Sequence, residues 1–184
     1  MKTNKISLRQ NKIRYFLVLI PHRDSLVIPR EIRRKLFEAG FPGAYSFPLA
    51  VPLAGLSEPL NREELKHAAG SIRNVTIAKQ GWITAGNPGL LQTQDFSFFG
   101  PVLDLPLADA VPFSGNRKIL HSFQKAVLCT AISAIPAAVE YEPFSFRAAI
   151  VTNLAILPLD SGAHLYSYKW RLGPEHWLPS FKGK

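Results

Sequence analysis

Cysteine is almost absent from this chain of 184 residues. Its one cysteine, Cys129, excludes an intrachain disulfide and a zinc site built from cysteines. Cys129 lies in a run with helical spacing, which favours a buried, inert thiol over a nucleophile. Apolar runs of the roughly 18–20 residues that a membrane span needs are missing as well. We therefore expect a cytoplasmic, monomeric protein with no membrane partner.

The motifs of common catalytic and nucleotide-binding sites are also missing. The sequence contains no P-loop, no G-x-G-x-x-G, no G-x-S-x-G and no H-E-x-x-H. None of the five histidines stands at metal-ligand spacing from another. Glu140 and Glu142 alternate beside Pro143, an arrangement that gives little support to a general acid–base pair. The sequence therefore predicts no metal and no cofactor.

Positive charge, in contrast, is plentiful and concentrated at the start of the chain. The whole chain carries +9, and residues 1–35 hold ten basic residues against two acidic ones, a net +8. A predicted helix in this region carries a basic patch. Its members are Arg30, Arg33, Arg34 and Lys35. Such a patch can attract a polyanion, which makes RNA or a nucleotide a possible partner. The alternative is a solvated tail and a solubilising helix face.

Fifteen prolines and twelve glycines indicate many turns and short elements, which favours an α+β fold. The first half of the chain predicts four elements. They are a strand over Ile13–Ile20, a helix from Pro29 that ends at Gly40, a strand of about Ala44–Ala54, and a helix opened by a capping box of Asn61 and Glu64. Pro48 and Pro52 indicate that the second strand is an edge strand or is bent.

The second half predicts strands with glycine and proline breaks between Val75 and Leu107. Ser114 then suits the start of a third helix, whose apolar face would comprise Leu120, Phe123, Val127 or Leu128, and Ile132. Two further strands follow, over Phe144–Leu157 and Leu165–Leu172.

Two of these predicted strands echo each other. Tyr45–Leu56 reads YSFPLAVPLAGL and Phe144–Leu157 reads FSFRAAIVTNLAIL, and both open with an aromatic residue, Ser and Phe. Each follows a strand and a helix-like run, which suggests two copies of one β-α-β unit whose central strands face a shared cleft. We expect one two-lobed domain over residues 12–179, with a basic arm at 1–11 and a tail at 180–184.

At these echo strands the chain resembles the 2H phosphoesterase superfamily, the 2′-5′ RNA ligase (LigT)-like proteins. The resemblance implies a pseudo-twofold fold of duplicated β-α-β units, with antiparallel sheets enclosing a cleft and helices outside. In that family each lobe supplies a His-hydrophobic-Thr/Ser motif. The two histidines act as general base and general acid on a cyclic or 2′-5′ phosphodiester, and the hydroxyls hold the phosphate.

Carried over to this sequence, both motifs are broken. The first falls on Ala50-Val51-Pro52, which lacks the imidazole and the hydroxyl. The second falls on Ala149-Ile150-Val151 or, one residue later, on Ile150-Val151-Thr152, and lacks the histidine in either register. Because alanine, valine and proline cannot transfer protons, the degenerate positions Ala50, Pro52, Ala149 and Val151 predict no catalysis of the family type.

Polar groups near the second motif are the remaining candidates for ligand binding. Thr152 and Asn153 stand inside an apolar strand, and Tyr168 and Arg171 on the next strand could add a stacking face and an anion contact. Three functions remain open. They are a non-catalytic protein with a residual phosphate, nucleotide or RNA site, a structural or protein-interaction domain with a filled cleft, and a phosphodiesterase that uses other residues such as His22 or His121.

Overall fold

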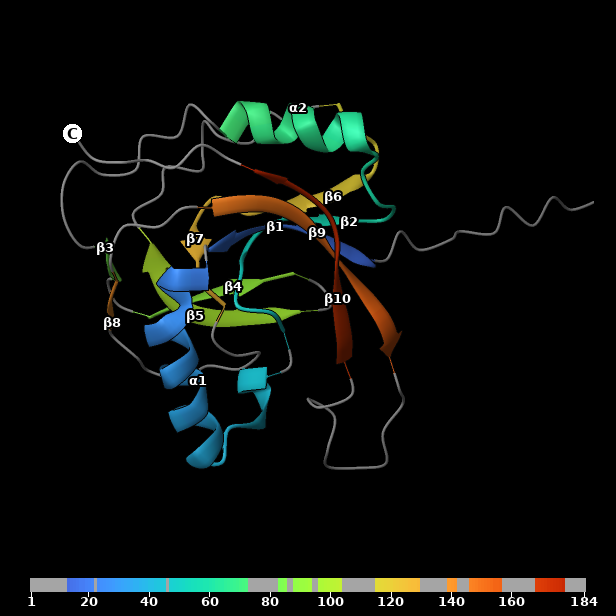
Figure 1. Ribbon diagram of the computed structural model, residues 1–184. Helices are drawn as coiled ribbons and strands as arrows, with labels where there is room; N and C mark the ends of the chain where they lie inside the picture. The colour runs from blue at the N-terminus through green and yellow to red at the C-terminus, as the bar shows by residue number, and fades with distance from the viewer. Residues whose placement is uncertain are drawn as a thin grey trace, which may run out of the picture.

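The computed structural model describes ten stretches of the chain. They are residues 13–21, 23–45, 47–72, 83–85, 88–93, 96–103, 115–129, 139–141, 146–156 and 168–177. These residues form a mixed α+β structure of antiparallel sheets and a few helices, which confirms the predicted α+β class, while the two-lobed duplicated arrangement stays a prediction (Figure 1). No helix among them is long and apolar enough to cross a membrane.

A five-stranded antiparallel sheet forms the centre of the molecule, with the strand order β10-β9-β1-β2-β6. Its strands are β1 (Tyr15–Pro21), β2 (Val51–Leu56), β6 (Ile119–Ser122), β9 (Phe146–Ile156) and β10 (Tyr168–Trp177). A smaller sheet contains β4 (Pro88–Gln92), β5 (Ser97–Leu103) and β7 (Ala126–Val127), and β3 (Ile83–Ala85) pairs with β8 (Val139–Tyr141). Both echo strands, β2 and β9, therefore pair with β1 in one sheet.

Strand β1 is central because its sequence is apolar on both faces. Side chains alternate along a strand, so Phe16 and Val18 face one side of the sheet while Leu17 and Leu19 face the other, and all four are buried. The smaller sheet covers the first side, and α2 (Arg62–Ile72) covers the second (Figure 1). Near-continuous apolarity is what a strand covered on both faces requires.

Strand β2 is an interior strand between β1 and β6, so the prediction of an edge strand is wrong and its alternative, a bent strand, is confirmed. The pairing with β1 shifts between Leu17 and Val18, which leaves Pro52 opposite Val18 beside a bulge. On the other side β6 pairs only with residues 54–56 of β2. Pro52 therefore lies where no ladder hydrogen bond from its nitrogen is needed.

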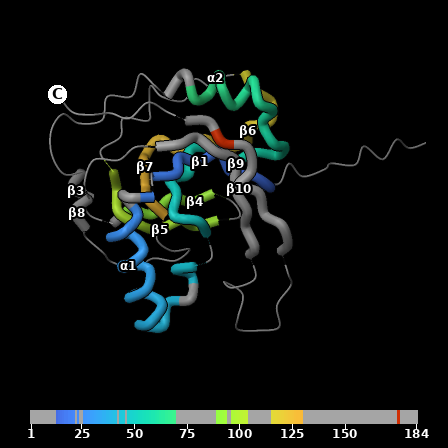
Figure 2. The backbone as a smooth tube through the Cα atoms, viewed as in Figure 1, coloured from blue at the N-terminus to red at the C-terminus, as the bar shows by residue number. Residues whose placement is uncertain are grey.

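Helix α1 (Val27–Glu38) follows the short 3-10 helix η1 (Arg23–Leu26) and leads into η2 (Pro42–Tyr45). Gly40 has a φ of 88°, its N–H donates to the Phe37 carbonyl, and the N–H of Phe41 donates to Leu36. This is the glycine-terminated helix end that the sequence predicts. Figure 2 shows that α1 and α2 lie at opposite ends of the described structure.

Helix α2 begins with the predicted capping box. The Asn61 side chain accepts from the N–H of Glu64 at 2.9 Å, and the Glu64 carboxylate accepts from the N–H of Asn61 at 2.7 Å. Lys118, at the start of the β6 region, donates to the same carboxylate at 2.6 Å. These bonds hold the start of α2 against the edge of the five-stranded sheet.

The predicted third helix is wrong, because β6 and β7 occupy the described part of that segment. The spacing of Leu120, Phe123 and Val127 suits a helical face, but it also suits a chain that crosses from one sheet to the other. Residues 54–56 pair with β6, and Phe123 donates its N–H to the Leu53 carbonyl. These distant partners decide the local conformation. Ser114 and Ile132 lie outside the described residues.

Candidate functional site

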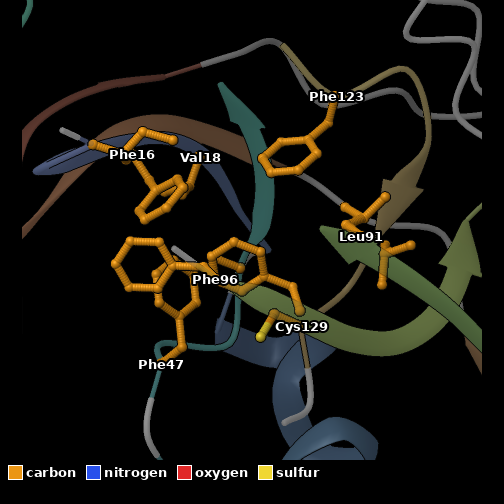
Figure 3. Packing of buried hydrophobic residues seen from close by; sticks show 11 residues of the cluster. Phe16, Val18, Phe47, Leu91, Phe96, Phe123 and Cys129 are labelled. Carbon is orange, nitrogen blue, oxygen red and sulfur yellow. The ribbon is translucent and has the colours of Figure 1, made fainter. Parts of the chain in front are cut away.

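An aromatic cluster fills the space between the five-stranded sheet and the β4-β5-β7 sheet (Figure 3). Phe98 packs against Phe16 and Phe47 with ring centroids 5.0 and 4.8 Å apart. Ala50, the position that carries histidine in the resembled family, is fully buried in this cluster and lies beside its rings. The first motif position therefore adjoins closely packed side chains.

The two degenerate motifs occupy equivalent places beside β1. Pro52 of β2 and Ala149 of β9 both pair with Val18, from opposite sides. Val151 pairs with Phe16. Because neighbouring strands are about 4.8 Å apart, the backbones of the two motif strands are separated by about 10 Å.

The predicted ligand-binding residues of the second motif lie on the β9–β10 pair. Thr152 and Arg171 are directly opposite each other, which brings these two together in register. Asn153 instead pairs with Trp170, and Tyr168 pairs with Ile156 farther along. The structure thus places Thr152 and Arg171 next to each other in the sheet. The binding role of all four residues stays a prediction.

The predicted basic patch is divided by the structure. Arg30, Arg34 and Lys35 are exposed on α1, whereas Arg33 is buried, with only 6% of its surface accessible. Arg34 forms ion pairs with Glu31 at 2.5 Å and with Glu38 at 2.7 Å. Its charge is therefore balanced on the helix itself, and the patch is less cationic than its sequence suggests.

A pocket of about 750 Å³ lies between α1, η2 and the segment that enters β2, and we name it the α1 pocket. Its deepest lining residues are Leu26 and Arg33, which are 8% and 6% exposed. The half-buried residues Ile20, Pro48 and Leu49 form its walls. This volume lies within the range of about 300–1,000 Å³ that is usual for small-molecule sites.

The mouth of the α1 pocket combines charge with an aromatic ring. Val27, Arg30, Glu31, Arg34 and Tyr45 line it, and all five are exposed. Figure 2 shows the two segments that bound it, α1 in blue and the cyan stretch that leads to β2. No lining residue among those described comes from β9 or β10. The α1 pocket is thus separate from the predicted site at the second motif.

Arg33 is the unusual residue of this pocket. One of its terminal nitrogens donates to the Cys129 carbonyl at 2.9 Å, and its buried Nε has no hydrogen-bond acceptor among the described residues. Burial lowers the pKa of Arg33, although the nearby Cys129 and Tyr45 side chains oppose this effect. Arginine still remains charged at neutral pH. The fold therefore buries a cation for which the described residues provide no carboxylate.

Cys129 links this arginine to both sheets. Its N–H donates to the Ala50 carbonyl at 2.9 Å, and the preceding Leu128 donates to Pro101 of β5 at 3.0 Å. The prediction of a buried thiol is confirmed. Arg33 is consequently held at the junction of α1 with the two sheets, which limits its freedom to move.

Sequence reasoning placed Arg33 on the solvent face and did not identify Tyr45, Pro48 or Leu49 as site residues. A signal for Arg33 was present. Positions 26, 29, 33 and 36 have helical 3-4-3 spacing, and the other three positions are apolar. A lone arginine within an apolar stripe indicates a buried guanidinium. Tyr45 had no comparable signal, since its place depends on how η2 packs beside α1.

Comparisons with family models, with characterised proteins and with solved structures find no match to this chain. Among the described residues, no group of three or more His, Cys, Asp or Glu side chains is placed to hold a metal ion. His121 lies on β6 with its ring 4.7 Å from that of Phe123, and His22 lies outside the described residues. Among the described residues, the α1 pocket is therefore the candidate site.

Proposed function

We propose that this protein is a non-catalytic relative of the 2H phosphoesterases that binds a phosphate-bearing ligand in the α1 pocket. The observation that carries the proposal is Arg33, a buried cation in the lining of the α1 pocket whose Nε has no partner among the described residues. An uncompensated buried charge is costly to folding. A ligand that supplies an anionic oxygen would provide both the missing acceptor and the missing charge.

The family part of the proposal rests on the sequence echo of the two motif strands. Pro52 and Ala149 pair with Val18 from opposite sides, but both strands share β1 in one sheet, and β6 and β7 stand where the helix of a second β-α-β unit was predicted. The non-catalytic part is supported by the residues at these positions, because none of them can exchange a proton. The pocket adjoins the first motif through Pro48 and Leu49, which directly precede Ala50.

The first test combines turnover with binding. The full chain is incubated with 2′,3′-cyclic nucleotides and 2′-5′-linked dinucleotides near neutral pH, and calorimetry measures binding of nucleotides and short RNA at low and high salt. We expect no hydrolysis, and binding that weakens as salt rises because a phosphate contact releases counterions. Arg33→Met should reduce affinity about ten- to a hundredfold, the value of a charge-assisted hydrogen bond. Arg62→Gln, at an exposed position on α2 outside the pocket lining, is the control.

Absence of binding at low salt would overturn the proposal. It would favour a second candidate, a structural or protein-interaction domain, which the filled space between the sheets supports. Hydrolysis abolished by replacing His22 or His121 would instead favour an active phosphodiesterase whose catalytic residues lie outside the motifs.

A further inference from the structure

The charge of the α1 pocket narrows the class of ligand. Glu31 and Arg34 both line the pocket and bond to each other at 3.0 and 2.5 Å, so their charges cancel. Among the described residues, Arg30 forms no ion pair, and Arg33 donates to the Cys129 carbonyl while its Nε has no partner. The lining residues that the structure describes therefore leave two uncompensated positive charges.

These two charges can act on one group. Arg30 and Arg33 are three residues apart on α1, a spacing that places side chains about 5–6 Å apart on one side of a helix. Both line the same pocket, Arg33 as a buried residue and Arg30 as an exposed residue at the mouth. A phosphate that reaches Arg33 thus passes within reach of Arg30.

We infer that the α1 pocket selects a terminal phosphomonoester over a phosphodiester. A monoester carries a charge close to −2 at neutral pH, because its second pKa is about 6, and so balances both arginines. A cyclic or internal diester carries only −1 and leaves one arginine uncompensated. This inference rests on the proposed function, and it separates this pocket from the cyclic diester substrates of the resembled family.

The remainder of the ligand would meet the aromatic ring of Tyr45 and the apolar side chain of Val27 at the mouth, beside its charged residues. Tyr45 is 55% exposed there, and Phe37 fixes its ring from the other side, edge to face, with centroids 5.2 Å apart. Val27 is 68% exposed beside the same opening. A ring held in place with an accessible surface is a suitable stacking partner for a nucleobase. A nucleoside monophosphate, free or at the 5′ end of RNA, has both required parts.

The test compares three adenosine ligands, one with a phosphomonoester, one with a cyclic phosphodiester and one without a phosphate. Calorimetry at neutral pH and low salt measures affinities of the full chain for AMP, 2′,3′-cyclic AMP and adenosine. We expect AMP to bind about tenfold or more tightly than cyclic AMP, and adenosine to bind weakest. Equal affinities for AMP and cyclic AMP would overturn the inference while leaving the proposed function intact. Absence of binding by all three and by RNA would overturn both.

Two variants show whether the arginines produce this preference. Arg30→Gln replaces an exposed side chain, so folding should be preserved, and it should reduce the preference for AMP over cyclic AMP to about twofold. Arg62→Gln, on α2 outside the pocket lining, should leave the preference unchanged. An Arg30→Gln protein with the original preference would contradict the inference. If a 5′-phosphorylated oligoribonucleotide binds more tightly than its 5′-hydroxyl form, the ligand is the 5′ end of an RNA chain. If AMP alone binds tightly, the ligand is a free nucleotide.

Discussion

The aromatic cluster between the sheets and the α1 pocket lie on either side of the same four residues, 47–50. Phe47 and Ala50 belong to the cluster, whereas Pro48 and Leu49 between them line the pocket. In the cluster every side chain is apolar and its neighbours are in contact. In the pocket one of the lining residues is a buried arginine whose Nε has no partner among the described residues.

This difference indicates which region of the fold is suited to ligand binding. A protein gains stability when buried polar groups are replaced by well-packed apolar ones, which is the state of the cluster. Retaining Arg33 has the opposite effect on the ligand-free protein. A feature that lowers stability in the absence of ligand is expected where a ligand repays it on binding.

The largest expected effect comes from removing a ring of the cluster. Phe98 is fully buried and contacts the rings of Phe16, Phe47, Phe96 and Phe123. Phe98→Ala should lower the free energy of unfolding by about 3–5 kcal/mol, measured by urea denaturation, because a cavity is left in a closely packed site. Leu90→Ala, at a 45% exposed position, is the control. A loss below about 1 kcal/mol for Phe98→Ala would mean that the cluster is not closely packed.

Restoring the imidazole of the first motif should also destabilise the protein. Ala50 has no accessible surface, so Ala50→His inserts a larger, polar side chain among packed rings. We expect a loss of about 1–3 kcal/mol in thermal unfolding and no hydrolysis of 2′,3′-cyclic nucleotides. Ala39→His, at the exposed end of α1, serves as the control. A stable Ala50→His protein that hydrolyses these substrates would show that the cluster conceals a functional site.

Arg33→Met should raise the free energy of unfolding of the ligand-free protein, in contrast to the two preceding substitutions. Methionine fills a similar volume without burying a charge, although the Cys129 carbonyl loses its donor. We expect Arg33→Met to be more stable than the wild type by about 1 kcal/mol in urea denaturation. Arg33→Ala, which also leaves a cavity, should be less stable than Arg33→Met. A strongly destabilised Arg33→Met protein would assign Arg33 to the framework and remove the argument for a ligand.

Much of this framework follows from local sequence. The apolar strand β1, the glycine end of α1 and the capping box at Asn61 are each decided by residues close in the chain, and each is confirmed. The segment with β6 and β7 was wrongly predicted as a helix, because its pairing partners are far away in sequence. The α1 pocket was missed for the same reason, since it exists only where η2 and residues 48–49 meet α1.

A second cation, Lys118, differs from Arg33 because it is paired with a carboxylate. Its ammonium donates to the Glu64 carboxylate at 2.6 Å, in a place where both side chains are partly buried. The hydrogen bond from Lys118 is the main reason why the pKa of Glu64 lies below its usual value, and the backbone bond from Asn61 adds to it. The charge of Lys118 is thus balanced by Glu64 within the fold, and this ion pair contributes to stability without needing a ligand.

Glu64→Gln should therefore cost about 0.5–1 kcal/mol at pH 7, the range of a helix cap combined with a partly exposed ion pair. Because folding lowers the pKa of Glu64, its contribution is complete above the pKa of the unfolded chain and is lost as pH falls through the folded value. The wild type and Glu64→Gln should thus converge below about pH 4 in urea denaturation. Glu63→Gln, beside it but exposed, should change little at any pH. A Glu64→Gln difference that persists unchanged at pH 3 would show that shape rather than charge supports this contact. The contrast between Lys118, which has a carboxylate partner, and Arg33, which has none among the described residues, would then lose its electrostatic basis.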